Sequence, residues 1–210
     1  MLNKFKWVVV LSVLCCMCCT VRAADYTYDD GDPNNHLWSS KFNWTGDAVP
    51  VAPIGKIHHK NGICVIDSSA GNIGIDSHFY LAETNDANMV MTPDAGSLTT
   101  DGFMIVCYTA GKRGYVEVNV GTCDFRNSTI GLGIGWSGSG TMVVNGGTVA
   151  ASSVRMPHAA QAVAGNRLEI HGGTMTSRDT FIMSYPVGST DNEVLIDGGA
   201  LYAQTHMRIG

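Results

Sequence analysis

Charged residues make up only 15% of this 210-residue chain, and no segment repeats apolar residues at helical spacing. A sustained period of about 3.6 residues is the main sign of an amphipathic helix, so its absence argues against a helical fold. Glycine, by contrast, is abundant, with 25 residues. This balance favours many short strands that are joined by tight turns.

Cysteine is also scarce once the N-terminus is set aside. Lys4 and Lys6 precede an apolar run at 7–19, and small residues follow up to Ala23. These features predict a signal peptide at 1–23, cleaved after Ala23, and therefore a secreted or cell-surface protein. Acylation of a cysteine in the run is an alternative that the bulky preceding residues disfavour. The run is shorter than the roughly 20 residues of a membrane span, so we expect none.

Cleavage removes four of the seven cysteines and leaves Cys64, Cys107 and Cys123. An odd number of cysteines is not a disulfide framework, although a Cys107–Cys123 bond stays open. Cleavage also leaves 10 basic residues (13 less the three in the signal) against 18 acidic ones, a net charge of −8. This charge argues against nucleic acid or an anionic membrane as a partner.

Three Gly-Gly pairs follow one another at intervals of 26 residues, at 146–147, 172–173 and 198–199. Apolar residues repeat at about the same interval. They form three columns, namely Val116, Met142, Leu168 and Val194; Val118, Val144, Ile170 and Ile196; and Leu98, Cys123, Val149, Met175 and Leu201. A fixed period of this size is typical of a solenoid, in which each coil buries its apolar face against its neighbours.

Three short apolar segments per repeat predict an all-β fold, a right-handed parallel β-helix with three short strands per coil and about six coils. The repeats occupy 62–210. We interpret 24–61 as an irregular N-terminal cap, in which Trp38 and Trp44 cover the open end of the first coil. Because the chain stops within a coil, we interpret it as truncated at the C-terminus, with further coils or another chain expected beyond Gly210.

A polar residue lies before the turn of each coil. The set is Asp67, Asp94, Asn119, Asn145, His171 and Asp197. Such residues cap turns with their side chains, and the functional alternative is a ladder that binds a sugar chain. Calcium is only weakly supported because it needs several converging oxygens per ion, whereas the ladder supplies one side chain per coil. We therefore predict no metal site and no cofactor.

Two other motifs have weak chemical meaning. His58 and His59 are adjacent, so on a strand they point apart, and no third ligand lies at zinc spacing; we expect a solvated loop. The glycine-rich string at 133–138 matches the dinucleotide fingerprint. Because a strand and not a helix follows it, we interpret it as a turn between coils.

A polysaccharide-degrading enzyme would require paired acidic groups, and a lyase would also need a basic residue beside them. Arg155, Arg178 and Arg208 follow the glycine turns at unequal distances and are not predicted to share a column. Three or more carboxylates with an Arg or Lys on one exposed face of the structure would rank such an enzyme above a structural rod. The sequence alone reveals no such cluster and no catalytic residue.

Two sequence features resemble a known family. They are the string Leu37-Trp38, Asn43-Trp44, Gly46 and Val49-Pro50, and the later coils of the form Gly-x-Gly-x-Met-x-Val-x-Gly-Gly-x-Val. Both are similar to exported bacterial β-helix proteins of the autotransporter and PEP-CTERM types. The resemblance implies architecture and export, and it assigns no catalytic residue.

The expected function is therefore a structural or adhesive surface rod, with polysaccharide or a cell-surface glycan as its partner. One alternative is a lyase or glycoside hydrolase of the pectate-lyase-like β-helix class. Another is a trimeric fibre. Fold alone does not separate these functions.

Overall fold

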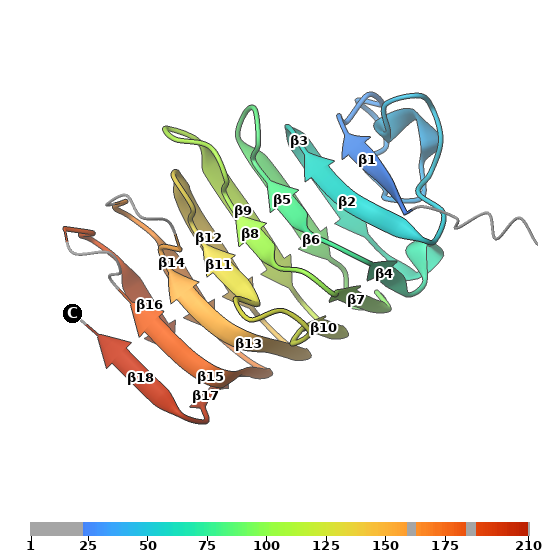
Figure 1. The fold of residues 1–210 in the computed structure, drawn as a ribbon. Coiled ribbons are helices and arrows are strands. Elements are labelled where there is room, and N and C mark those ends of the chain that lie inside the picture. Colours follow the sequence, from blue (N-terminus) through green and yellow to red (C-terminus); the bar gives the residue numbers. More distant parts are fainter. Residues whose placement is uncertain (1–22, 159–162, 184–187, 210) are drawn as a thin grey trace, which may run out of the picture.

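Short segments with alternating apolar residues pair in parallel with the equivalent segments of the neighbouring coils. The computed structural model describes residues 23–158, 163–183 and 188–209. In this part the chain forms a parallel β-solenoid of about seven turns (Figure 1). The predicted fold class is confirmed, while the expected number of six coils is one too few. Apart from Ala23, the predicted signal peptide lies outside the described residues.

The first strand of each coil belongs to a six-stranded sheet. Its members are β3 (Gly62–Ile66), β6 (Ala87–Met91), β9 (Arg113–Val118), β12 (Ser139–Val144), β14 (Arg167–Ile170) and β16 (Glu193–Ile196). Neighbouring strands in this sheet pair in parallel, one coil apart.

The second and third strands of the coils belong to one continuous 12-stranded sheet. The second strands are β4 (Ile73–Ile75), β7 (Ser97–Thr100), β10 (Thr122–Phe125), β17 (Ala200–Ala203) and the first halves of β13 (Thr148–Met156) and β15 (Thr174–Met183). The third strands are β2 (Ile54–His59), β5 (Phe79–Leu81), β8 (Met104–Val106), β11 (Leu132–Ile134), β18 (His206–Ile209) and the second halves of β13 and β15.

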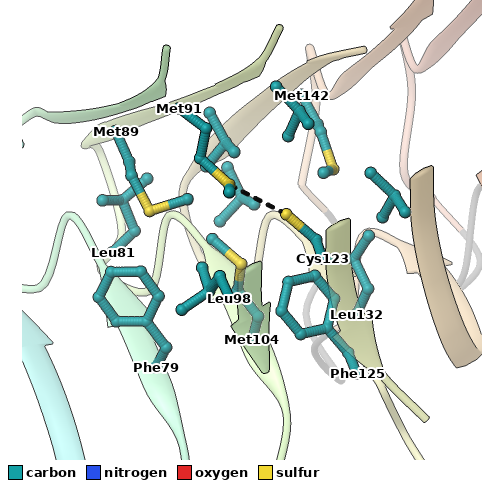
Figure 2. Close-up of a cluster of buried hydrophobic side chains, with 14 of the residues drawn as sticks. Phe79, Leu81, Met89, Met91, Leu98, Met104, Cys123, Phe125, Leu132 and Met142 are labelled. Carbon is teal, nitrogen blue, oxygen red and sulfur yellow. Dashed lines mark hydrogen bonds between the residues drawn. The ribbon is translucent and has the colours of Figure 1, made fainter. Parts of the chain in front are cut away.

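The register confirms the apolar columns expected from the sequence. Met142 pairs with Val116 on one side and with Leu168 on the other. In the second strand, Cys123 pairs with both Leu98 and Val149. Equivalent side chains therefore stack down a shared interior, as Figure 2 shows for its central coils. The interior is rich in methionine, whose flexible thioether fills irregular gaps between neighbouring columns.

Cys64, Cys107 and Cys123 are free and buried. The Sγ of Cys123 lies 3.1 Å from the Sδ of Met91 (Figure 2), and no Cys107–Cys123 disulfide forms. Burial raises the pKa of both Cys107 and Cys123 to about 12. These thiols are therefore packing groups, since only the thiolate is a strong nucleophile.

The Gly-Gly turns are places where successive coils approach too closely for a side chain. A Cβ on Gly172 would lie against the carbonyl oxygen of Asn145, one coil earlier, and Gly198 has the same relation to His171. Glycine is required at position 173 for a different reason. Gly173 has a φ of +67°, which L-residues with side chains rarely adopt.

The N-terminal segment 24–61 is only partly irregular. In this segment β1 (Ala24–Tyr28) pairs with β2, although both were expected to be irregular. Because β2 also pairs with β5, it is the third strand of the first coil. Two short 3-10 helices, η1 (Lys41–Asn43) and η2 (Ser68–Ala70), complete the N-terminal region. The backbone N–H of Trp38 donates to the carbonyl of Val65 (2.8 Å), which occupies part of the open edge of β3.

Buried aromatic rings fill the N-terminal end of the core. Trp44 lies edge-on to Trp38, with centroids 4.6 Å apart, and edge-on to Tyr28 at 5.1 Å. The indole N–H of Trp44 donates to the carbonyl of Trp38 at 2.7 Å. At the other end, Ile196 and Ile209 are 46% and 66% exposed, although their columns are buried in earlier coils. Within the described ranges, no helix is both long and apolar enough to cross a membrane.

We expect Gly172→Ala to destabilise the solenoid by about 1–3 kcal/mol, because the added methyl group must push two coils apart. Gly74→Ala in β4 is the matched control, since the nearest neighbour of its Cβ would be Thr99 Oγ1 at 3.7 Å. Its effect should stay within about 0.5 kcal/mol. Urea unfolding of both variants measures the difference, and equal effects would contradict the close-contact explanation.

Candidate functional site

Four of the six ladder residues lie in one column at the turn after the first strand. They follow the ends of β9, β12, β14 and β16 as Asn119, Asn145, His171 and Asp197. The Nδ2 of Asn145 donates to the Oδ1 of Asn119 at 2.9 Å, and the Nδ1 of His171 lies 2.7 Å from the Oδ1 of Asp197. These side chains therefore bond to one another between neighbouring coils.

The other two ladder residues behave differently. Asp67 is in the column, but it caps η2 by accepting the backbone N–H of Ser69 at 3.0 Å. Asp94 is outside the column: Ile66 pairs with Met91, which places Thr92 opposite Asp67. Asp94 accepts the hydroxyl of Thr92 at 2.5 Å, and this bond is the main cause of its lowered pKa.

The Asp94 assignment is wrong because the coils do not all have the same length. Equivalent positions lie 25 residues apart between β3 and β6 (Gly62 and Ala87) and 27 apart between β6 and β9 (Ala87 and Gly114). The two deviations cancel over two coils. Counting back from Asn119 by about one period therefore leads to Asp94, which lies two positions after Thr92, the residue that occupies the column.

A carboxylate cluster lies beside the ladder on the last two coils. The Oε1 of Glu169 lies 2.7 Å from the Nε of Arg167, and its Oε2 lies 2.8 Å from the Nε2 of His171. Glu193 is 3.4 Å from Arg167, and Asp197 is 2.7 Å from His171. The hydrogen bond to Asp197, followed by the one to Glu169, raises the pKa of His171.

This cluster contains three carboxylates and an arginine on one outer face, which is the feature expected to favour an enzyme. Its groups, however, bind one another instead of converging on a common point. Within the described ranges, no group of three His, Cys, Asp or Glu residues is placed to hold a metal ion. The cluster therefore supplies the right residue types without an arrangement for calcium-assisted chemistry.

His58 and His59 lie on β2 and not in a solvated loop, so that expectation is wrong. Their side chains point to opposite sides of the sheet, as expected for adjacent strand residues. His58 faces outward and lies 2.9 Å from Glu83, whereas His59 is fully buried in the column of Leu81. Burial lowers the pKa of His59 to about 4, against the opposing effect of the backbone at Asn61 and Gly62.

A continuous set of outward-facing rings covers the third side of the first five coils, and sequence reasoning missed it. We call this set the aromatic strip; it contains His58, His78, Tyr80, Phe103, Tyr108, Trp136 and His158. The rings come from β2 and β5, from the residues directly before β5 and β8, and from the residues just after β8, β11 and β13.

Most neighbouring rings in the strip are stacked nearly parallel. The centroids of Trp136 and His158 are 4.5 Å apart with 11° between their planes, and Tyr108 stacks on Trp136 at 5.9 Å and 27°. His78 and Phe103 are 3.9 Å apart at 16°. Tyr80, Tyr108 and Trp136 are half-exposed, whereas the two ring nitrogens of His158 are buried.

Gly133 explains why His158 fits into the strip. It lies in β11, in the outward column between Ile105 and Arg155. A Cβ at this position would clash with the imidazole of His158 and with the side chain of Ile105. The glycine-rich string at 133–138 therefore makes room for a side chain. It continues into β12 and into no helix, so the interpretation as a turn between coils holds.

His158 and Arg155 carry polar atoms without partners. His158 is 7% exposed, and neither ring nitrogen forms a hydrogen bond within the described part of the chain. The same is true of the buried Nε of Arg155. Burial, followed by the charge of Arg155, lowers the pKa of His158 to about 4, so the imidazole is neutral at neutral pH.

The third strands also correct the expected placement of the arginines. Arg155 pairs with Ile182, which pairs with Arg208, so Arg155 and Arg208 share one outward column. Arg178 lies outside this column and contacts Asp179 at 3.5 Å.

The strip was hidden in the sequence because its spacing is irregular. Tyr108 follows Tyr80 by 28 residues, Trp136 follows Tyr108 by 28, and His158 follows Trp136 by 22. The turns after the third strand differ in length, so counting by 26 misses these positions. A usable signal was present nonetheless, since Tyr108, Trp136 and His158 each lie two residues after the last residue of a third strand.

Comparison of the chain with protein-family models, with curated proteins and with solved structures gives no significant match. The resemblance to autotransporter-type and PEP-CTERM-type proteins therefore stays a prediction, and the function must be argued from the side chains.

We expect the free energy of unfolding to decrease as the pH is lowered, because His59 is buried in its neutral form. Its folded pKa of about 4 is below the ordinary value of 6.5, so protonation favours the unfolded chain. This contribution is complete above pH 6.5 and falls as the pH drops to about 4, by at most about 3 kcal/mol. His59→Phe should remove it, while His158 keeps a similar contribution in both proteins.

Denaturant unfolding at about pH 7 and about pH 4.5 measures this effect. The variant should lose less stability between the two conditions than the wild type. Equal losses would show that His59 is not held neutral by burial.

Proposed function

We propose that the protein is an exported structural rod that binds polysaccharide along the aromatic strip. The observation that carries this proposal is the strip itself, a line of rings along the coil axis in which every ring except that of Phe103 carries a polar group. The stacked coils supply a rigid support, and a rigid support keeps the rings in a fixed order for a ligand.

The chemistry of the strip matches a sugar. Tyr80 and Tyr108 carry phenol groups and Trp136 an indole N–H, and none of these groups forms a hydrogen bond within the described ranges. A phenol both donates and accepts, as does a neutral imidazole. Sugar hydroxyls have the same dual character, and sugar C–H groups can lie against the apolar parts of the rings.

The length of the strip favours a polymer over a small molecule. Its rings come from five consecutive coils, separated by four intervals. With about 4.8 Å between neighbouring strands, the strip is about 19 Å long. Compact ligands bind in concave pockets that enclose most of their surface, whereas this surface is a line of outward-facing groups.

The polar ladder has a structural role in this proposal, since its side chains bond to one another along the turn column. The apolar side chains exposed in the last coil are expected to be covered by further coils or by another chain, which leaves the trimeric fibre as one form of the assembly. Localisation at the cell surface agrees with the predicted signal peptide.

The carboxylate cluster favours a second candidate, a polysaccharide-degrading enzyme. Glu169 is the least exposed carboxylate of the cluster, with 18% of its side chain exposed, and it lies between Arg167 and His171. A carboxylate and an imidazolium in contact are groups that can move a proton. The rod is preferred because the cluster is self-paired and lies outside the aromatic strip.

Trp136→Ala should weaken polysaccharide binding about tenfold or more, because truncation removes a large ring that stacks on Phe103, Tyr108 and His158. Tyr202→Ala is the matched control, since Tyr202 is 58% exposed on β17, outside the strip. A glycan microarray identifies a bound polysaccharide, and affinity electrophoresis with that polysaccharide measures both variants. Equal losses in the two variants, or no bound glycan, would reject the strip as the binding surface.

The enzyme is tested by incubating the protein with the same polysaccharides and measuring new reducing ends and unsaturated sugar ends. The rod predicts no increase in either. If chains are cleaved and Glu169→Gln abolishes the cleavage, the enzyme replaces the rod as the preferred function. Glu193→Gln, which alters a more exposed carboxylate of the cluster (54% of its side chain), is the control for a general change in charge.

A further inference from the structure

Arg155 is half-buried and forms no ion pair in the described part of the chain, whereas Arg113 and Arg208, which also form none, are exposed. Arg126 and Arg167 form ion pairs with carboxylates at 2.5 and 2.7 Å, and Arg178 contacts Asp179. The Nε of Arg155 is fully buried and has no hydrogen-bond partner in the described ranges. An unsatisfied buried donor destabilises the folded chain, and more so when the donor is charged.

The surroundings of Arg155 contain a second unsatisfied group. His158 lies beside Arg155, because Gly133 pairs with Arg155 and a Cβ on Gly133 would lie 2.8 Å from the Cβ of His158. The two ring nitrogens of His158 have no partner in the described ranges, although the residue is more than nine-tenths buried. Trp136 stacks on the His158 ring at 4.5 Å. Glu83 lies at the other end of the aromatic strip, where it contacts His58 at 2.9 Å.

We propose that Arg155, His158 and Trp136 form a subsite for an anionic substituent on a bound saccharide. This inference rests on the proposed function, because it assigns the charge of the ligand that lies along the aromatic strip. The guanidinium of Arg155 binds the oxygens of a carboxylate or a sulfate ester, for which its planar set of donors is well suited.

The neutral imidazole of His158 has one donor and one acceptor, which match a hydroxyl group on the same sugar. The Trp136 ring supports the imidazole from one side. Arg155 is half-exposed, so an anionic group can reach its guanidinium, whereas the Arg155 Nε and the two His158 nitrogens are covered in the unbound chain and bind a ligand only when these side chains move. The net charge is −5 for the whole chain and −8 after the predicted cleavage at Ala23, and both values oppose anionic polymers in general. Binding at this subsite therefore depends on local contacts and not on long-range attraction.

The test uses the full secreted chain and gels that contain one of six polymers. Cellulose and dextran backbones are each used in a neutral, a carboxymethylated and a sulfated form, which separates a carboxylate from a sulfate ester. We expect at least one anionic form to retard the protein about tenfold more strongly than the neutral form of the same backbone. Arg155→Met should abolish this preference, and Arg155→Lys should restore only part of it.

Arg178→Met is the matched control, because it makes the same change in net charge at an exposed arginine outside the subsite. It should leave the preference unchanged. Equal losses in the Arg155 and Arg178 variants would indicate a general charge effect and overturn the subsite. Retardation by neutral forms alone would overturn the subsite but keep the polysaccharide-binding rod. Retardation by none of the six polymers would count against both proposals.

Discussion

Parallel hydrogen bonding between successive coils is the constraint on which the rest of the structure depends. Each strand lies about 4.8 Å from the strands of the neighbouring coils, so every residue has an equivalent neighbour on both sides. At the turns this spacing leaves no room for a side chain, and Gly172 therefore packs directly against the backbone of Asn145. In the interior the same spacing brings Met142 against Val116 and Leu168. Glycine turns and apolar columns are thus two consequences of one arrangement.

The sequence predicted these consequences because both are periodic. The interior columns, three strands per coil and the all-β fold are correct, since the positions that produce them cannot drift without breaking the stack. Turns outside the stack are free to vary in length. Asp94 was assigned to a column that Thr92 occupies, because two coils of 25 and 27 residues compensate for each other. The strand β2 was missed for a related reason, since it precedes the first regular repeat.

The candidate sites were predictable to different degrees. The ladder at Asn119, Asn145, His171 and Asp197 follows strands of equal spacing, and it was found. The aromatic strip follows turns of unequal length, and it was not. Its members also look unremarkable alone, because a single Trp136 or His158 is more often a packing residue than a binding residue. Only the fold brings rings from five coils to one side.

Inward and outward positions carry different information about function. An inward ring such as Phe79 is required to fill the core, so its presence says nothing about a ligand. Stability of the core does not require outward rings in successive coils, and stacking alone would be satisfied by phenylalanine. The strip instead uses Tyr80, Tyr108, Trp136 and His158, whose polar atoms are left without partners in the described part of the chain. Stacking accounts for the ring faces but not for these polar edges, and a hydroxyl-rich ligand accounts for both.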